Sequence, residues 1–209
     1  MGDWGSLVVG SALARIIPDR AVYGYDPNFD VQAHLEKFNS VLAKLKFGGT
    51  FGFGAKRAAD IISDIARQHD VKAQYLLVSL DREQGLVSGN ASRLDAKDPK
   101  LKRAITWATG YGAWHGKPEA EWSTKWQGFE KQLAGAASAA QQARTGRGPY
   151  ASVPEIVATK RPIKLLSPPG AQVTPANIAS AMLYVYTPSR NTGVDNQNLF
   201  KRHAPDLVA

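Results

Sequence analysis

The chain of 209 residues contains no cysteine. Disulfides, thiolate metal sites and a cysteine nucleophile are therefore excluded. The four histidines are scattered, and none has the paired spacing of a zinc site. The Gly-x-Ser-x-Gly elbow of serine hydrolases is also absent. We accordingly expect no metal ion and no cofactor. The histidines are His34, His69, His115 and His203.

The N-terminal stretch Trp4 to Pro18 lacks the features of a signal peptide. It is mildly apolar, it is interrupted by Arg15, and Asp3 is the only charged residue before it. A spanning helix needs ~20 apolar residues, and a secretory signal begins with a basic region. The stretch is predicted to be a packed or loosely membrane-associated helix.

Acidic residues are fewer than basic ones, with 18 Asp and Glu against 26 Lys and Arg and a formal charge of +8. This balance favours an anionic partner, which could be nucleic acid, an acidic membrane surface or a bacterial envelope polymer. Because the basic residues are spread along the chain, solubility explains the charge equally well. No nucleic-acid-binding motif is recognised, so we expect no nucleic-acid partner.

The length allows one well-buried core, and a second domain is not required. Apolar residues at spacings of three and four predict amphipathic helices, and one segment that is apolar on most sides predicts a central helix. The expected fold class is mainly α, as a helical bundle around that central helix with a small β-hairpin. The expected helices cover residues 29–46, 55–69, 72–84 (the central one), 118–144 and 175–186; β-prone pieces lie at 155–159 and 163–166.

The remaining segments are expected to be irregular. Four glycines in residues 47–54 predict a loop or hinge, residues 89–99 are polar and loop-like, and 104–116 is too broken for a long helix. A polar tail is expected after Pro188. Residues 1–50 are expected to form an N-terminal helical segment of unknown role and 51–209 the main domain, unless the chain is one continuous domain.

The central helix ends in two carboxylates, Asp81 and Glu83. A carboxyl group at the end of an apolar helix should be partly desolvated, and desolvation favours the protonated form. A general acid needs that property. The plainer interpretation is that Glu83 faces solvent and pairs with Arg82 or Lys72. Asp81, two residues earlier, should face a different side of the helix.

Three segments, in order, resemble a lysozyme-like family of wall-degrading proteins of bacteria and phages, whose wider relatives are soluble lytic transglycosylases and goose-type lysozymes. In that family an apolar helix ends in Glu-Gln-Gly or Glu-Gln-Ser. The resemblance covers roughly residues 56–203 and implies a lysozyme-like helical fold. The matching segments are LLVSLDREQGL in Leu76 to Gly89; ATGYG at 108–112, followed by KWQGF at 125–129; and AMLYVYTP at 181–188, followed by NLF at 198–200.

The resemblance also implies roles for individual residues. Glu83 corresponds to the catalytic acid and base, and Tyr184 or Tyr186 corresponds to a tyrosine that faces it. Two departures concern polar contacts to sugar: Val185 replaces the family's asparagine, and Ala113-Trp114 stands where secreted relatives carry cysteine. The candidate substrate-binding residues are Gln84, Thr109, Tyr111, Tyr184 and Tyr186.

The implied reaction is cleavage of the β-1,4 bond between the MurNAc and GlcNAc sugars of peptidoglycan. Hydrolysing glycosidases use two carboxyl groups, whereas lytic transglycosylases of this family use one glutamate and a hydroxyl of the sugar itself. No carboxylate pairs with Glu83 at short range, although Asp95 or Asp98 could approach it in space. The sequence therefore favours a lytic transglycosylase, with a hydrolysing muramidase or a chitinase-type enzyme as alternatives.

The expected partner is bacterial peptidoglycan, with an anionic outer envelope or membrane surface as a further one, and the chain is expected to be monomeric. These expectations fit a phage endolysin or virion-associated lysin, which is made in the host cytoplasm and acts on the wall. Trp107 and Trp114 are candidates for stacking on sugar, whereas Trp122 and Trp126 are expected in the core. A different class is a non-enzymatic module that binds an anionic polymer through residues such as 101–103 and 160–161.

Overall fold

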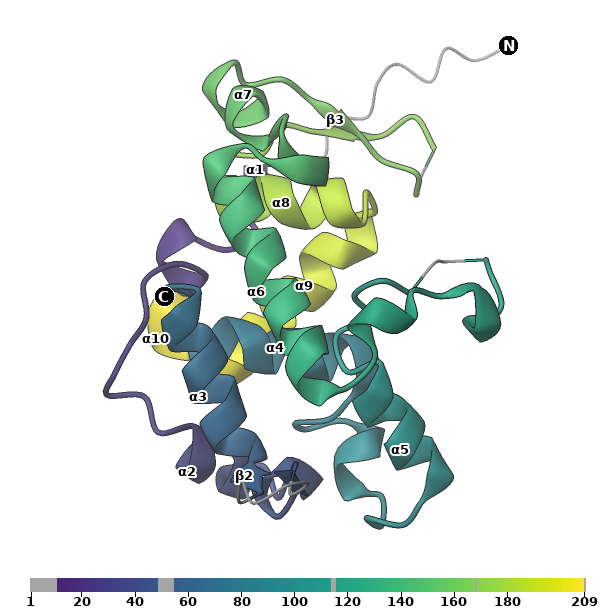
Figure 1. Ribbon diagram of the computed structural model, residues 1–209. Coiled ribbons are helices and arrows are strands. Elements are labelled where there is room, and N and C mark those ends of the chain that lie inside the picture. Colours follow the sequence, from purple (N-terminus) through teal and green to yellow (C-terminus); the bar gives the residue numbers. More distant parts are fainter. Residues whose placement is uncertain (1–10, 49–54, 114–115, 168, 209) are drawn as a thin grey trace. The chain divides into compact units, whose positions relative to one another are not determined.

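The computed structural model describes residues 11–48, 55–113, 116–167 and 169–208 (Figure 1). It is mainly helical, and its described strands form two small antiparallel sheets. The mainly α prediction is confirmed. The chain divides into two compact units, one made of residues 1–23 and 139–209 and the other of 24–138. The expected domain boundary at residue 50 falls within the residue range of the second unit. The division of the chain at that point stays a prediction.

The unit 24–138 begins with a helix that is shorter than expected. Asp30 caps α2, accepting a hydrogen bond from the Ala33 amide at 2.9 Å. The predicted helix 29–46 is wrong in length, because Asn39 takes a left-handed backbone with φ of 51°. Ser40 then caps a new short turn. The elements here are α2 (Val31–Lys37), a 3₁₀ turn (Val41–Ala43), and β1 (Lys46–Phe47) paired antiparallel with β2 (Lys56–Arg57).

Helices α3 (Ala58–Gln68) and α4 (Ala73–Gln84) follow closely the predicted ranges. Isoleucines and alanines on one face of α3 are buried. Helix α4 is buried from Ala73 to Val78 and again at Leu80 and Asp81, as expected of a central helix. Gly85 ends it with φ of 63°, the left-handed conformation that glycine adopts without strain.

The second half of this unit contains a short helix that was not given bounds in advance and lacks part of a long helix that was. The short helix, α5 (Pro99–Thr106), lies between the segments 89–99 and 104–116 and overlaps only their ends; Asp98 caps it and Pro99 lies in its first turn. The long helix expected over 118–144 begins only with α6 (Phe129–Thr145). Before it the chain makes separate short turns, and Gly128 has φ of 108°, which a helix cannot contain. Those turns are the 3₁₀ helices Glu119–Glu121 and Thr124–Trp126, and a further 3₁₀ helix, Asn90–Arg93, precedes α5.

In the other unit, hydrogen bonds join the N-terminal segment to helix α8 (Ile178–Tyr186). The Asp19 carboxylate accepts from the Ala179 amide at 2.7 Å, and the Ser180 hydroxyl accepts from the Ile16 amide at 2.9 Å. Within the predicted N-terminal helix, residues 11–14 form α1 (Ser11–Ala14), and residues 4–10 lie outside the described part. A 3₁₀ turn follows at Asp19–Ala21.

The rest of this unit corrects four expectations. Residues 155–159 are not a strand but lie mostly in α7 (Val153–Ala158), and the strand that pairs with β3 (Ile163–Lys164) is instead β4 (Gln172–Val173). Helix α8 begins three residues later than the expected range 175–186, and Asn177 caps it. The expected polar tail is helix α9 (Arg190–His203), which Ser189 caps directly after Pro188 ends α8. The remaining elements are a 3₁₀ turn (Gly148–Tyr150) and α10 (Pro205–Val208).

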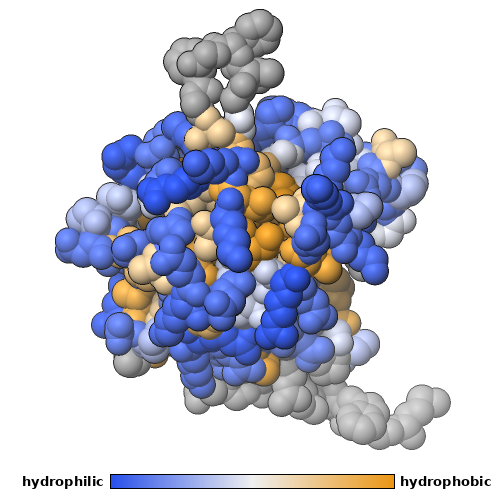
Figure 2. All heavy atoms as spheres, turned by 90° about the horizontal axis from the view of Figure 1, so that it is seen from below, coloured by the Kyte–Doolittle hydropathy of each residue, from blue (hydrophilic) through white to orange (hydrophobic). Residues whose placement is uncertain are grey.

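Figure 2 shows one face of the molecule, on which hydrophilic residues predominate and apolar residues are visible between them. None of the helices in the described ranges combines the length and apolar character needed to cross a bilayer.

Candidate functional site

Asp81 in α4 is a buried carboxylate that holds the turn after the helix. Its side chain accepts hydrogen bonds from the main-chain amides of Val87, Ser88 and Gly89 at 3.0, 2.7 and 3.1 Å and from the Ser88 hydroxyl at 2.6 Å. Asp81 is 7% exposed. A buried carboxylate with this set of donors is satisfied in its ionised form, so Asp81 has the environment of a structural residue.

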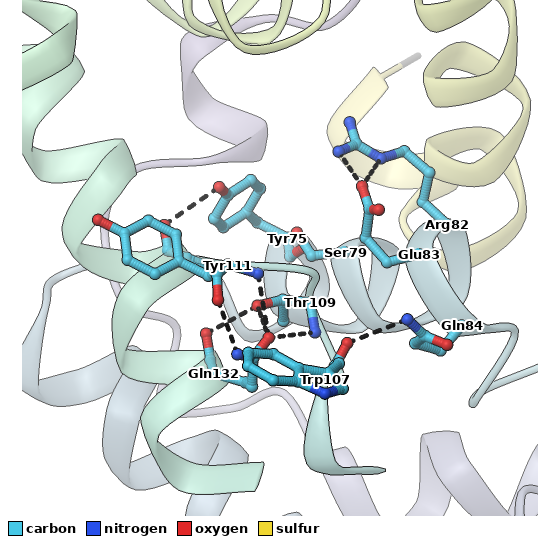
Figure 3. Close-up of polar contacts among 10 residues, drawn as sticks. Tyr75, Ser79, Arg82, Glu83, Gln84, Trp107, Thr109, Tyr111 and Gln132 are labelled. Atoms are coloured by element: carbon cyan, nitrogen blue, oxygen red, sulfur yellow. Dashed lines mark hydrogen bonds and ion pairs between the residues drawn. The ribbon is translucent and has the colours of Figure 1, made fainter. Parts of the chain in front are cut away.

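Glu83, two residues later, has a different environment (Figure 3). Its side chain is 26% exposed. Oε1 accepts from the guanidinium of Arg82, through Nε at 2.8 Å and through Nη2. The pairing with Arg82 is the one that the plainer interpretation of Glu83 proposed. It leaves Oε2 as the carboxyl oxygen that Arg82 does not engage.

Oε2 of Glu83 lies against the backbone of Gly110. Gly110 has φ of 65°, and a Cβ atom built on it would stand 3.1 Å from that oxygen. A side chain here would therefore meet both backbone strain and a contact closer than ordinary van der Waals distance. Glycine at this position lets the segment ATGYG approach the carboxyl group.

The segment 107–111 is joined to the end of α4 by Gln84. The Gln84 side-chain amide donates to the carbonyl of Trp107 at 3.1 Å. Trp107 is 1% exposed, and its indole N–H donates to Glu119 at 2.7 Å. The expectation that Trp107 stacks on sugar is therefore wrong, because its ring is in the core. Trp114, the other candidate, lies outside the described residues.

Glu119 is an exposed carboxylate fixed by two donors. Arg103 Nε donates to its Oε2 at 2.7 Å, and the indole of Trp107 donates to its Oε1. The hydrogen bond from Arg103, followed by the one from Trp107, lowers the pKa of Glu119. These contacts attach the turn Glu119–Glu121 to α5.

Gln132 in α6 is the residue of this site that the sequence did not indicate. It is fully buried, at 0% exposure, and its side-chain amide bonds to main-chain groups of Thr109, Tyr111 and Trp126. Figure 3 shows it beside the segment that carries Thr109 and Tyr111. A possible signal was its position three residues after Phe129, on the side of α6 that the apolar pattern buries.

Tyr111 packs against the ring of Trp126 and against Gly135 of α6. Its ring lies edge-on to Trp126, with centroids 4.7 Å apart and planes at 87°. A Cβ atom on Gly135 would stand 2.4 Å from the Tyr111 ring, so only glycine lets α6 lie this close. Partial burial raises the pKa of Tyr111. Trp126 and Trp122 are only partly buried, so their assignment to the core is only partly correct.

The structure brings Glu83, Gln84, Thr109 and Tyr111 into one unit, around the contact between α4 and the segment 107–111. Thr109 is buried, and its hydroxyl donates to the main-chain carbonyl of Gln132 at 2.8 Å. The polar groups of Gln84 and Thr109 thus make contacts that organise the segment. Their assignment to sugar binding stays a prediction.

Tyr184 and Tyr186 belong to the other unit. The Tyr184 hydroxyl donates to the carbonyl of Leu13 at 3.0 Å, and burial raises the pKa of Tyr184 to about 12. Tyr186 is 41% exposed. The Tyr184 hydroxyl therefore has a structural partner within its own unit, and the assignment of a tyrosine facing Glu83 stays a prediction.

The two other carboxylates considered as partners of Glu83 make local contacts. Asp95 accepts from the Lys97 amide at 2.8 Å, and Asp98 accepts from the Lys100 amide at 2.7 Å as the cap of α5. No group of three or more histidine, aspartate and glutamate side chains among the described residues is arranged to hold a metal ion.

Comparison with known proteins found no match to a family model, to a curated protein or to a solved structure. Any functional assignment therefore rests on the motifs in the sequence and on the geometry around Glu83.

Proposed function

We propose that the protein is a peptidoglycan-degrading enzyme of the lysozyme-like type, which cleaves the β-1,4 bond between MurNAc and GlcNAc with Glu83 as its acid and base. The observation that carries the proposal is the approach of Gly110 to Oε2 of Glu83. It places two of the three motifs of the resemblance, Glu-Gln-Gly and Ala-Thr-Gly-Tyr-Gly, against each other. They are 25 residues apart in sequence, counted from Glu83 to Ala108.

In this proposal the two carboxyl oxygens of Glu83 have different tasks. Oε1 accepts hydrogen bonds from Arg82, which hold the carboxyl group in one orientation. Oε2 carries the proton, gives it to the glycosidic oxygen, and the bond from that oxygen to the sugar carbon C1 breaks. A hydroxyl of the same sugar attacks C1, and its proton returns to Oε2. The product is an anhydro sugar, and no water is consumed.

The lytic transglycosylase reaction is favoured over hydrolysis by the carboxylates around α4. Hydrolysis by two carboxyl groups needs the second to activate water or to attack the sugar. Asp81 is occupied by four donors, and Asp95 and Asp98 hold turns of their own backbone. The protein is then an endolysin or virion-associated lysin of a phage, with peptidoglycan as its partner.

A second candidate function is non-enzymatic binding of an anionic envelope polymer. Four exposed cations between residues 93 and 102 favour it, because none of them forms an ion pair with another described residue. Arg103 and Arg161, in the basic segments that the sequence suggested, instead pair with Glu119 and Glu155. The four cations are Arg93, Lys97, Lys100 and Lys102.

The experiment that separates these functions measures soluble fragments released from purified peptidoglycan, together with co-sedimentation of the protein. The enzyme should release fragments, and Glu83→Gln should release none while it still sediments with the wall. Glu130→Gln, an exposed glutamate of the same unit, is the matched control and should retain activity. If the unaltered protein only binds, and binding is lost when Lys97, Lys100 and Lys102 are replaced by glutamate, the second function is correct.

A further inference from the structure

The side-chain amide of Gln132 in α6 forms four hydrogen bonds, all of them to main-chain groups. Oε1 accepts from the main-chain amides of Thr109 at 3.1 Å and Tyr111 at 3.0 Å. Nε2 donates to the main-chain carbonyls of Tyr111 at 2.8 Å and Trp126 at 2.7 Å. Both hydrogens of the amide and its oxygen are thereby used, and every partner lies outside regular α-helix.

These bonds determine where Gly110 lies. Thr109 and Tyr111 flank it, and both have their amides on the same oxygen of Gln132. The Thr109 hydroxyl adds a bond to the Gln132 carbonyl at 2.8 Å. With the residues on either side fixed to α6, Gly110 has little freedom to move toward or away from Oε2 of Glu83.

The same segment is held at its other end from α4. Gln84, the residue next to Glu83, donates to the carbonyl of Trp107 at 3.1 Å. Two glutamines from two helices thus fix the segment 107–111 relative to the carboxyl group of Glu83. Gln84 stands in the motif that carries the resemblance, whereas Gln132 lies outside the motifs.

We infer that Gln132 is a positioning residue for glycan cleavage, which acts by holding Gly110 against Oε2 of Glu83. The inference rests on the proposed function. A displacement of about 1 Å in a reacting group lowers rates by about 100-fold. Loss of the Gln132 amide should therefore slow the chemical step more than it weakens the binding of substrate.

Gln132→Met is the variant that isolates the amide. Methionine has a similar length and fills the buried space, but it neither donates to the two carbonyls nor accepts from the two amides. Gln74→Met is the matched control. Gln74 is a buried glutamine of α4 in the same unit, and its Oε1 has no hydrogen-bond partner among the described residues. It precedes Glu83 by nine residues, about 13 Å along a helix.

The experiment measures kcat and KM on a soluble peptidoglycan glycan, with circular dichroism and hydrogen exchange of the Thr109 and Tyr111 amides. Gln132→Met should lower kcat by about 10- to 100-fold with KM changed less than about threefold, and both amides should exchange faster. Gln74→Met should retain kcat. If Gln132→Met does not fold, Thr109→Val takes its place. It removes only the hydroxyl contact and should lower kcat by about threefold at unchanged KM.

The outcomes separate this inference from the proposed function. If the unaltered protein releases fragments and folded Gln132→Met has an unaltered kcat, the positioning role is refuted and the proposed function stands. Equal losses of kcat in Gln132→Met and Gln74→Met would also refute it, because they would indicate a general effect of removing a buried amide. If the unaltered protein releases no fragments, the proposed function is refuted, and the inference is refuted with it.

Discussion

Asp81 and Glu83 are two carboxylates on one helix, two residues apart, and their surroundings differ in almost every respect. Asp81 is 7% exposed and accepts from three main-chain amides and a hydroxyl. The Glu83 side chain is 26% exposed, with an arginine on one oxygen and a glycine backbone beside the other. The protein satisfies the first carboxylate fully and leaves one oxygen of the second available.

This difference separates a structural carboxylate from a candidate reactive one. A buried ionised group is stable only when hydrogen bonds replace its hydration, and Asp81 has them. A catalytic acid must exchange a proton with substrate, so one of its oxygens has to remain without a competing donor. The contrast predicts that changes at Asp81 affect folding, whereas changes at Glu83 affect activity.

The largest effect is expected from Glu83→Gln. If Oε2 transfers the proton, this substitution should lower the release of peptidoglycan fragments by at least about 100-fold. The midpoint of thermal unfolding should stay equal to that of the unaltered protein or rise, because reactive carboxyl groups are often costly to stability. The release assay and a thermal melt measure the two effects. A variant that lyses walls normally would refute the assignment.

Asp81→Asn should have the opposite effect. Asparagine keeps one acceptor oxygen but places an NH₂ group where the carboxylate accepted, and it loses the charge that strengthens the remaining bonds. The free energy of unfolding should fall by about 2 kcal/mol, as measured by urea denaturation. Asp95→Asn, at an exposed position with one local bond, is the control and should change stability by less than about 0.5 kcal/mol. Equal stability of the two variants would contradict the structural role of Asp81.

Gly110→Ala tests the contact between the two motifs. Alanine in the left-handed region costs about 1 kcal/mol, and its Cβ atom would also press on Oε2 of Glu83. Gly116→Ala has a similar backbone conformation, with φ of 79° and no atom within 4 Å of the added Cβ. Both variants should lose similar stability, but only Gly110→Ala should lose activity, by about tenfold or more. Equal activity in the two would show that the contact has no role in the reaction.

The smallest effect is expected from replacing Glu119, a third carboxylate, which is exposed but accepts hydrogen bonds from Arg103 and Trp107. The pKa of Glu119 is lower in the folded protein than in the unfolded chain, where it is near 4.5. The contacts of Glu119 therefore stabilise the fold when the pH is above 4.5. This stabilisation is lost as the pH falls through the lower pKa of the folded protein. Thermal melts of Glu119→Gln and the unaltered protein should differ at pH 7 and converge as the pH falls below 4.5. A difference that is constant with pH would show that the carboxylate charge is not involved.

The sequence predicted the part of the fold in which the local signals agree. Helix α4 is apolar on most sides, and its bounds, Ala73–Gln84, lie close to the expected range 72–84. The helix expected over 118–144 failed because Trp122 and Trp126 share its spacing with Phe129 and Leu133 by coincidence. The left-handed Gly128 interrupts the chain, and the tryptophans pack against Trp107 and Tyr111 instead.

The candidate site was predictable only in part. The resemblance implied that Glu83 and the segment 108–112 belong to one site, and the structure places Gly110 beside the carboxyl group. Gln132 was missed because its partners are main-chain groups, so its place on the buried side of α6 was the one signal in the sequence. Helix α9 was also missed, because a polar helix with few apolar residues has no periodic pattern to find.

The most direct test of the central claim is mass spectrometry of the fragments released from purified peptidoglycan by the unaltered protein and by Glu83→Gln. The account predicts fragments with anhydromuramyl ends, one water lighter than hydrolysed ends, from the unaltered protein and none from Glu83→Gln. Reducing muramic ends would contradict the lytic transglycosylase reaction. Fragments from Glu83→Gln, or none from a folded unaltered protein, would contradict the role assigned to Glu83.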